Sequence, residues 1–368
     1  MAVWSLAEWA IVAAVALVLA ASCTHFSIAY ALHRQLLDQP GQRRSHQVPT
    51  PRGGGIGIVV GALFVIALFA AQSESSIRAL ALSVMAAVVV VGMVGWIDDH
   101  GGLRARTRLA AHCLAALVLL ATPAVLIGLS DPITGRGALL MYTLAAVFPG
   151  LAIVWSINLH NFMDGIDGLL ALQAMFVLGT LAWICLLTGY PGQAGCIGAC
   201  AIAAGGFLPF NFPRARIFMG DVGSGVLGLL VAIAVLWQMA TPGIALASGI
   251  VLCSAFVTDA TCTLLSRMLR GRRWYSAHRE HLYQWLVRCG FSHARVVALY
   301  MGWNLLIVLP AVYWMNRMAR TGASIVDGPT TNRFGPAVAV YALACTVWWL
   351  GKRWCLRNVT TRSRHAAA

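Results

Sequence analysis

Charged residues are scarce in this sequence of 368 residues. Only 10% of the residues are charged, whereas a soluble globular protein carries about 25%. Hydrophobic residues make up 60% of the chain, and the mean hydropathy is +0.78. The composition therefore excludes a soluble globular protein and indicates a polytopic membrane protein.

The sequence also lacks the pattern of a zinc site or a disulfide framework. The 10 cysteines are scattered, mostly inside apolar runs, and Cys196 and Cys200 lie one helical turn apart without further His or Cys ligands nearby. We interpret them as small buried side chains. The first apolar run follows the acidic Glu8 and lacks a basic region before it, so it is expected to be a retained transmembrane helix and not a cleaved signal peptide.

Apolar runs of about 20 residues, each long enough to cross a bilayer as a helix, recur along the whole chain. The predicted spans cover residues 9–32, 53–72, 79–97, 109–128, 138–157, 168–188, 194–211, 224–240, 244–266, 296–315 and 335–351. The predicted fold class is an all-α polytopic membrane protein of about 11 transmembrane helices, with 10 as the alternative count. No linker or soluble part interrupts them, so residues 1–368 are expected to form a single integral membrane domain whose motifs lie at about 52–284.

The basic residues predict the orientation of the chain. Of the 26 Lys and Arg residues, this topology with an external N-terminus leaves on the outer side only Arg78, Arg136, Arg317, Arg320 and Arg333. The positive-inside rule therefore predicts an external N-terminus and a cytoplasmic C-terminus. The net charge of +14 is explained by membrane topology, so no nucleic-acid partner is expected.

Acidic residues gather on the same inner face, although carboxylates contribute little to orientation. They are Asp98, Asp99, Asp164, Asp167, Asp221 and Glu280. Their convergence from separate loops predicts a functional site on the cytoplasmic face.

Residues 158–169 carry the strongest chemical signal. Asn158, Asn161, Asp164 and Asp167 recur at a spacing of three at the end of an apolar run, where bare charge costs several kcal/mol. Their oxygens suit a hard divalent cation, and the two Asp-Gly pairs let the backbone turn. The competing interpretation is a capped helix followed by a polar turn, which needs one such side chain and not four.

Two acidic residues and two arginines surround the end of the third predicted span. Adjacent Asp98 and Asp99 repel each other unless a cation or a proton lies between them, which favours a metal site or an acid–base pair. Arg104 and Arg108 lie one helical turn apart and could hold a phosphate at the headgroup level. Ordinary positive-inside arginines explain each of them equally well.

Two later stretches extend the candidate site. Asp221 lies among glycines at the start of the eighth span, where the backbone can approach an anion closely. The long internal loop combines aromatic rings with Arg272, His278, Arg279 and His281, which suits a nucleotide diphosphate. The alternative for this loop is an interfacial segment that binds anionic lipid.

An ion-coupled transporter is the competing functional class, because intramembrane carboxylates and broken helices also describe such carriers. Against it, the carboxylates lie at one face and no repeat relates the two halves of the chain. Asp259 is the acidic residue placed inside a predicted span, and we expect it to pair with a nearby arginine such as Arg267.

Taken in order, these stretches resemble the polyprenyl-phosphate N-acetylaminosugar-1-phosphate transferase family, which is glycosyltransferase family 4. The family's Asp-Asp pair matches Asp98 and Asp99, and its Asn/Asp-rich run matches residues 158–169. Its Phe-Met-Gly-Asp loop matches residues 218–224, and its late His-containing loop matches residues 278–281. The late loop is most similar to the bacterial branch that starts O-antigen chains with acetamido-dideoxy sugars. It lacks the His-His-His run of the peptidoglycan-precursor branch.

The resemblance implies a sugar-phosphate transfer at the inner membrane of a bacterium. A UDP-N-acetylaminosugar would give its phosphosugar to undecaprenyl phosphate and release UMP, which starts O-antigen or other cell-surface polysaccharide synthesis. The implied sugar is an acetamido-dideoxyhexose such as N-acetylfucosamine or N-acetylquinovosamine, or N-acetylglucosamine. The implied cofactor is Mg²⁺, with Mn²⁺ as the alternative; membrane lipid is a further partner, and a homodimer is compatible with the resemblance.

The resemblance also implies roles for individual residues. Asp98, Asp99 and Asp164 would be catalytic, with Asp98 or Asp99 deprotonating or orienting the lipid phosphate, or attacking it as a nucleophile. The remaining assignments are metal binding by Asn161, Asp167 and Asp221, lipid-phosphate binding by Arg104 and Arg108, and nucleotide-sugar binding by Asn158, Arg272, His278, Arg279 and His281.

Overall fold

The computed structural model describes residues 4–39, 48–122, 138–272, 278–321 and 334–365. The first half contains α1 (Leu6–His33), β1 (Leu37–Asp38), β2 (Thr50–Pro51), α2 (Ile56–Gln72), α3 (Ser75–Gly101), α4 (Ala105–Leu120), α6 (Ala138–Met163) and α7 (Leu169–Leu187). The second half contains α8 (Pro191–Asn211), α9 (Gly220–Met239), α10 (Ser248–Leu252), α11 (Ser254–Leu269), α12 (Leu282–Arg288), α13 (His293–Trp303), the π-helical turn η1 (Asn304–Val308), α14 (Leu309–Thr321) and α15 (Gly335–His365).

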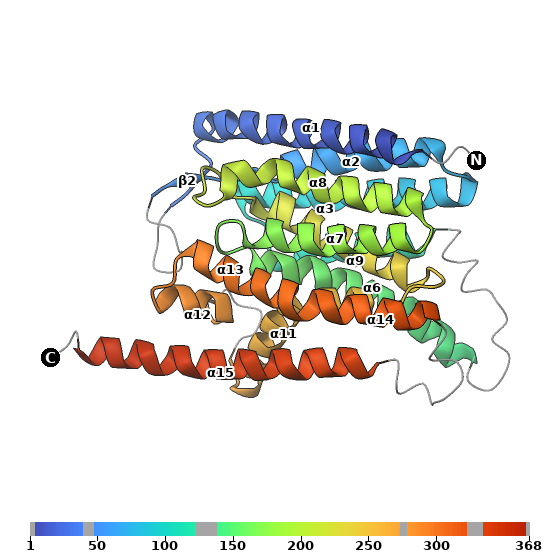
Figure 1. Ribbon diagram of the computed structural model, residues 1–368. Coiled ribbons are helices and arrows are strands. Elements are labelled where there is room, and N and C mark those ends of the chain that lie inside the picture. The colour runs from blue at the N-terminus through green and yellow to red at the C-terminus, as the bar shows by residue number, and fades with distance from the viewer. Residues whose placement is uncertain (1–3, 40–47, 123–137, 273–277, 322–333, 366–368) are drawn as a thin grey trace.

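The long helices lie side by side and run along one common direction (Figure 1). In the part of the chain that the structure describes, six of them are long and apolar enough to cross a membrane, by length and composition: α1, α3, α7, α8, α9 and the continuous helix His293–Arg320. Ile56–Gln72 and Val147–Met163 are shorter apolar helices. The prediction of a polytopic all-α membrane protein is confirmed, whereas the count of eleven spans stays a prediction.

Two predicted spans have a more complex course than the sequence indicated. The predicted span 244–266 is interrupted between α10 and α11, where the Cys253 amide donates to the carbonyl of Ile250 at 3.2 Å, a three-residue turn. The predicted span 296–315 is one continuous helix whose middle, η1, has π-helical hydrogen bonding. A π-helical turn adds one residue to the helical repeat and so reorients the side chains that follow it.

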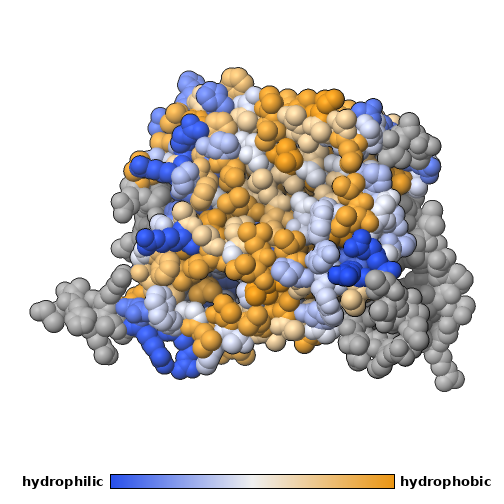
Figure 2. Space-filling view, viewed as in Figure 1, coloured by the Kyte–Doolittle hydropathy of each residue, from blue (hydrophilic) through white to orange (hydrophobic). Residues whose placement is uncertain are grey.

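The centre of the bundle is α9, which packs against α3, α6 and α7. Two buried apolar clusters meet at it, since both contain residues of α9. The first joins α9 mainly to α7, α8 and the helices from α10 to α15, and the second joins it mainly to α1, α2, α3, α4 and α8. Large apolar side chains remain exposed along the outside, among them Leu6, Ile11, Val18 and Phe26 of α1. The face in Figure 2 is accordingly apolar in its middle, with hydrophilic residues towards the two ends of the helices, as a lipid-embedded bundle requires.

A small antiparallel sheet, absent from the sequence expectations, lies at one end of the bundle. Leu37 pairs with Pro51, and the chain after β2 pairs in turn with the loop before α9. The Gly54 amide donates to the Phe218 carbonyl at 2.9 Å, and the Phe218 amide donates to the Pro51 carbonyl at 2.8 Å. This pairing places Arg52 beside the glycine-rich loop that carries Asp221.

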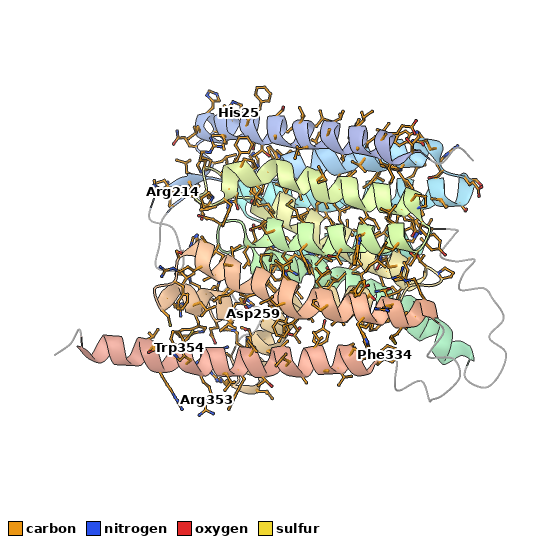
Figure 3. The ribbon with its side chains drawn as sticks, in the orientation of Figure 1. His25, Arg214, Asp259, Phe334, Arg353 and Trp354 are labelled. Atoms are coloured by element: carbon orange, nitrogen blue, oxygen red, sulfur yellow. The ribbon has the colours of Figure 1, made fainter. Side chains whose placement is uncertain are left out.

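The predicted pairing of Asp259 with Arg267 is wrong. Arg267 instead donates to Glu280. Asp259, which Figure 3 labels between α13 and α15, accepts hydrogen bonds from neutral donors of several elements, including the Tyr300 hydroxyl at 2.7 Å. Neutral donors satisfy the oxygens of this buried carboxylate, so no arginine is needed to pair with it.

Candidate active site

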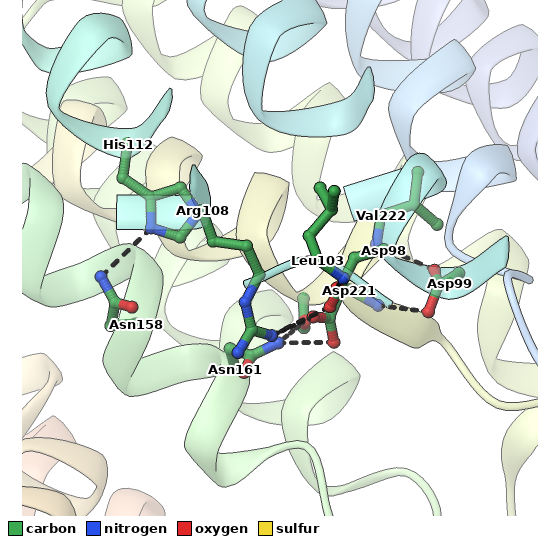
Figure 4. Close-up of polar contacts among 10 residues, drawn as sticks. Asp98, Asp99, Leu103, Arg108, His112, Asn158, Asn161, Asp221 and Val222 are labelled. Carbon is green, nitrogen blue, oxygen red and sulfur yellow. Dashed lines mark hydrogen bonds and ion pairs between the residues drawn. The ribbon is translucent and has the colours of Figure 1, made fainter. Parts of the chain in front are cut away.

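A guanidinium links two of the predicted site carboxylates (Figure 4). Arg108 Nη1 lies 2.9 Å from Asp98 Oδ2 and 2.8 Å from Asp221 Oδ2. Asp98 lies in the last turn of α3, Arg108 lies in the first turn of α4, and Asp221 lies in the first turn of α9. Asp221 is more than one hundred residues from Arg108 in sequence, so the complete cluster exists only in the folded bundle.

Asp99 is buried, with an exposed fraction of 3%, against the start of α9. Its carboxylate accepts hydrogen bonds from the backbone amides of Asp221 at 3.1 Å and Val222 at 3.2 Å. Free amides at a helix start stabilise a negative charge. Gly95 makes this approach possible, because an added Cβ there would lie 2.5 Å from the backbone of Asp221.

Asn161 joins the same cluster from the end of α6. Its side-chain amide donates to Asp221 Oδ1 at 2.8 Å and to the Ser224 hydroxyl at 3.1 Å. The three motifs that the sequence singled out separately therefore share one hydrogen-bonded network at one end of the bundle.

A cavity of about 260 Å³ opens beside this network. Its lining comprises Asp38, Arg52, Asp99, Asp164, Gly165, Ile166, Asn211, Phe218, Gly220, Asp221, Arg279, Gln284 and Val287. Asp99, Asp164, Asp221 and Arg279 were predicted as site residues. Asp38, Asn211 and Gln284 were not, because each is a single polar residue without a local motif. Arg52 precedes three glycines, and the sequence of that stretch fits a phosphate contact and an ordinary basic turn equally well.

Asp164 lies in the loop after α6 and faces an excess of negative charge. Burial and the charges of Asp221, Asp99 and Asp167 raise the pKa of this carboxyl to about 8. A group with such a pKa is neutral near pH 7 unless a cation approaches it. The Asp164 carboxyl in the cavity wall can therefore serve either as a proton carrier or as a ligand of a positive ion.

Asp167 has other partners. Its carboxylate lies 3.1 Å from His293 Nδ1 and accepts a hydrogen bond from the Ala215 amide at 3.2 Å. The contact ties the loop between α6 and α7 to the start of α13. Nothing in the sequence near His293 indicated it, because the two residues lie more than one hundred positions apart.

The oxygen ligands suited to Mg²⁺ are present at the cavity. Asp99, Asp164 and Asp221 line it, and Asn161, whose side-chain nitrogen donates to Asp221, carries an amide oxygen as a further ligand of the suited type. In the part of the chain that the structure describes, no three His, Cys, Asp or Glu side chains are grouped closely enough to hold a metal ion. The donor chemistry and the raised pKa of Asp164 nevertheless fit a divalent cation in the cavity, because its charge would offset that of the carboxylates.

Of the predicted nucleotide-binding residues in the late loop, only Arg279 lines the cavity. Arg272 donates to Glu280 at 3.1 Å, and although burial opposes it, Arg267 and Arg272 hold the pKa of Glu280 below its usual value. The rings of His278 and His281 lie 4.9 Å apart. Burial, and then the neighbouring His281, lowers the pKa of His278 to about 4, so this ring is neutral near pH 7.

Two further predicted residues lie outside the cavity lining. The Asn158 amide donates to the Val154 carbonyl at 2.7 Å and contacts His112 Nδ1 at 3.2 Å. Arg104 is exposed at the residue before α4, one turn from Arg108. The structure thus brings Asp98, Asp99, Asp221, Arg108 and Asn161 into one network.

Comparison with known proteins gives consistent similarities. A family model described as glycosyl transferase family 4 matches residues 81–239. The decaprenyl-phosphate N-acetylglucosaminephosphotransferase of Mycobacterium tuberculosis is 31% identical over 322 residues, which cover 78% of each chain. The undecaprenyl-phosphate alpha-N-acetylglucosaminyl 1-phosphate transferase of Salmonella typhi is 26% identical over 276 residues, 72% of each chain.

A phospho-N-acetylmuramoyl-pentapeptide-transferase, from Symbiobacterium thermophilum, is also similar. It is 32% identical over 290 residues, which cover 73% of this chain and 82% of the relative. These relatives cover a larger share of the chain than the matched segment, and that segment, residues 81–239, contains Asp98, Arg108, Asn161 and Asp221. The chain therefore belongs to glycosyl transferase family 4, as a multi-pass membrane protein.

Proposed function

We propose that this protein transfers an N-acetylaminosugar 1-phosphate from a UDP-sugar to undecaprenyl phosphate and releases UMP. The observation that carries the proposal is the network of Asp98, Arg108, Asn161 and Asp221 beside a cavity of about 260 Å³. The relatives named above supply the reaction class, since their names describe phosphosugar transfer to a polyprenyl phosphate. We place the protein in a bacterial inner membrane with the site at the cytoplasmic face, an orientation that the distribution of basic residues supports.

The cavity offers groups for both substrates. Arg52 and Arg279 line it and would bind the diphosphate of the nucleotide sugar. Arg108, next to Asp98, would bind the lipid phosphate, with Arg104 one turn away at the surface. Asn158, Arg272, His278 and His281 are kept as nucleotide-sugar ligands on the motif alone.

The chemistry is a displacement at phosphorus. An oxygen of the lipid phosphate forms a bond to the β-phosphorus of the UDP-sugar, and the bond from that phosphorus to the oxygen shared with UMP breaks. Asp99, or Asp98, would take a proton from the lipid phosphate or orient it, and Asp164 would hold a proton in the same cavity. The main task of the protein is to position two anions and offset their charge.

Mg²⁺ fits this site, and Asn161, Asp167 and Asp221 are the residues proposed to hold it. When bound, the ion would supply positive charge that offsets the diphosphate of the donor. The assignment of Asp221 and Asn161 is supported by their mutual contact at the cavity. The assignment of Asp167 rests on the motif.

The sugar is proposed to be an acetamido-dideoxyhexose or N-acetylglucosamine, and the product to start O-antigen or another surface polysaccharide. The transporter alternative has less support. Asp259, the carboxylate that it would use inside a span, is saturated by protein donors, including the Leu282 amide at 2.7 Å and the Tyr300 hydroxyl at 2.7 Å. The relatives are transferases.

A radiolabel transfer assay on washed membranes tests the proposal. The assay contains undecaprenyl phosphate, Mg²⁺ and a panel of UDP-acetamido sugars labelled in the sugar. Label in the lipid phase together with UMP release, both lost on addition of EDTA, is the expected result and names the donor. No transfer from any donor, with protein shown to be folded, would refute the proposed reaction.

A further inference from the structure

A buried carboxylate connects the C-terminal helix to the wall of the cavity. Asp259 of α11 has an exposed fraction of 2%. It lies outside residues 81–239, the segment that matches the family model, and none of the motifs described above includes it. Its partners come from four different elements, which is unusual for one side chain and points to a role in holding those elements together.

Three donors converge on Asp259 Oδ1. They are the backbone amide of Leu282 at 2.7 Å, the indole nitrogen of Trp348 at 3.0 Å and the hydroxyl of Thr263 at 3.3 Å. Oδ2 accepts from the hydroxyl of Tyr300 at 2.7 Å and from the amide of Tyr283 at 3.3 Å. A carboxylate offers about four lone-pair sites, so these donors occupy all of its capacity. The carboxylate is thus a fixed structural acceptor and not a free acid or base.

The bonds to Leu282 and Tyr283 fix the start of α12, which carries part of the cavity wall. Gln284 lines the cavity, and its side-chain amide donates to the Tyr283 hydroxyl at 3.1 Å. The Tyr283 hydroxyl donates in turn to the Phe162 carbonyl at 3.0 Å. An added Cβ on Gly165 would overlap this hydroxyl, so the tyrosine rests directly on the loop that carries Asp164. The position of Asp259 is therefore transmitted to two walls of the cavity.

The C-terminal helix α15 enters the same network through Trp348. α15 packs on α11, which crosses behind it in Figure 1, and on α12, where an added Cβ on Gly351 would lie 3.2 Å from Leu282 Cδ1. Lys352 is buried, with an exposed fraction of 5%, and its ammonium lies 4.5 Å from the Trp348 ring centroid. The next residue of α15, Trp349, is exposed.

We propose that Asp259 is a positioning residue for the donor side of the active site, and that α15 contributes to this through Trp348. The inference rests on the proposed function, because the cavity is taken as the place where the nucleotide sugar binds. Loss of the carboxylate frees the start of α12, which displaces Gln284 and loosens the loop of Asp164. Misplacement of binding groups by a fraction of an ångström weakens donor binding, whereas the lipid-phosphate side at Arg108 is held by separate contacts.

Steady-state kinetics of four proteins test the proposal: wild type, Asp259→Ala, Trp348→Phe and Trp349→Phe. We expect KM for the UDP-sugar to rise about tenfold in Asp259→Ala and about threefold in Trp348→Phe, with KM for undecaprenyl phosphate unchanged in both. Trp349→Phe is the matched control, because it makes the same exchange of indole for phenyl at an exposed position of the same helix. A purely structural role would lower the amount of active enzyme, and hence the maximal rate, without moving KM.

Hydrogen exchange provides a readout that does not need activity. In Asp259→Ala, amide exchange should become about tenfold faster both in residues 282–288 and in residues 162–168, and Trp349→Phe should leave both segments as in wild type. If Asp259→Ala does not fold, Trp348→Phe and Tyr300→Phe, which each remove one donor, are compared with the same control.

The two arms separate this proposal from the proposed function. If folded wild-type protein transfers sugar from no donor, the proposed function fails. The positioning role of Asp259 is then tested by amide hydrogen exchange alone. Faster exchange in residues 282–288 with no change in residues 162–168 would overturn the positioning role, as would an unchanged KM for the UDP-sugar in an Asp259→Ala protein that is folded and active.

Discussion

Arg108 provides the sharpest test of the proposed active site. Its guanidinium lies 2.9 Å from Asp98 and 2.8 Å from Asp221, so the substitution Arg108→Ala removes the positive charge shared by two carboxylates. The negative charges that remain would repel an incoming lipid phosphate, and the phosphate would also lose a bidentate donor. We expect the apparent KM for undecaprenyl phosphate to rise more than that for the UDP-sugar.

The structure sets the size of the effect. A hydrogen bond to a charged group contributes about 1.5–3 kcal/mol, which corresponds to about 10- to 100-fold in binding. The Arg108 side chain is 34% exposed, so solvent screens part of its charge and the lower end of that range applies. We therefore expect KM for undecaprenyl phosphate to rise about tenfold in Arg108→Ala. Arg108→Lys keeps the charge but loses the planar guanidinium, so its KM should lie between those of wild type and Arg108→Ala.

The assay measures initial rates in detergent or nanodiscs while each substrate is varied in turn. Arg106→Ala is the matched control, because Arg106 lies in the same first turn of α4, is exposed, and loses the same charge. A larger rise in KM for the UDP-sugar than for the lipid would mean that the two substrates have been assigned to the wrong sides of the site. An equal effect of Arg106→Ala would show that only the general surface charge matters.

Three further predictions concern the carboxylates and the helix contact that positions them. Asp221→Asn and Asp167→Asn are expected to keep expression and membrane insertion but abolish transfer and its Mg²⁺ dependence; retained activity in both would remove the metal assignment. The pKa of Asp164 is raised from 3.8 to about 8, so the folded protein holds a proton that the unfolded chain releases, and its stability should fall as pH rises through this window, by at most about 1.4 kcal/mol per pH unit. Thermal unfolding in EDTA between pH 6 and 8 should show this slope, which Asp164→Asn should flatten. Gly95→Ala should destabilise the protein by about 1–3 kcal/mol, because the new Cβ would lie 2.5 Å from the α9 backbone, whereas Gly101→Ala, with no atom within 4 Å, should have little effect on the unfolding temperature.

The sequence by itself determined the class of protein and the identity of most candidate groups. Hydropathy is a local property, since about 20 consecutive apolar residues suffice for a span, so the membrane bundle was readable without any tertiary information. Residues 158–169 and Asp98 and Asp99 were likewise readable, because clustered polar groups at the end of apolar runs have a cost that only function explains.

The tertiary structure decided which of these groups meet. Arg108 bridges Asp98 and Asp221, Asp167 contacts His293, and Asp259 binds backbone amides of α12 instead of Arg267. Each of these pairings except Arg108 with Asp98 joins different motifs or segments, and local periodicity carries no information about such contacts.

The composition of the cavity was also beyond the sequence. Arg52, Asn211 and Gln284 reach it through the small sheet, the end of α8 and the start of α12. The local sequence pattern identifies a residue that is costly to bury. Its partner depends on how segments distant in the chain pack together. At Gly95 the backbone of α9 approaches α3 closely, and at Gly165 the Tyr283 side chain approaches the loop after α6.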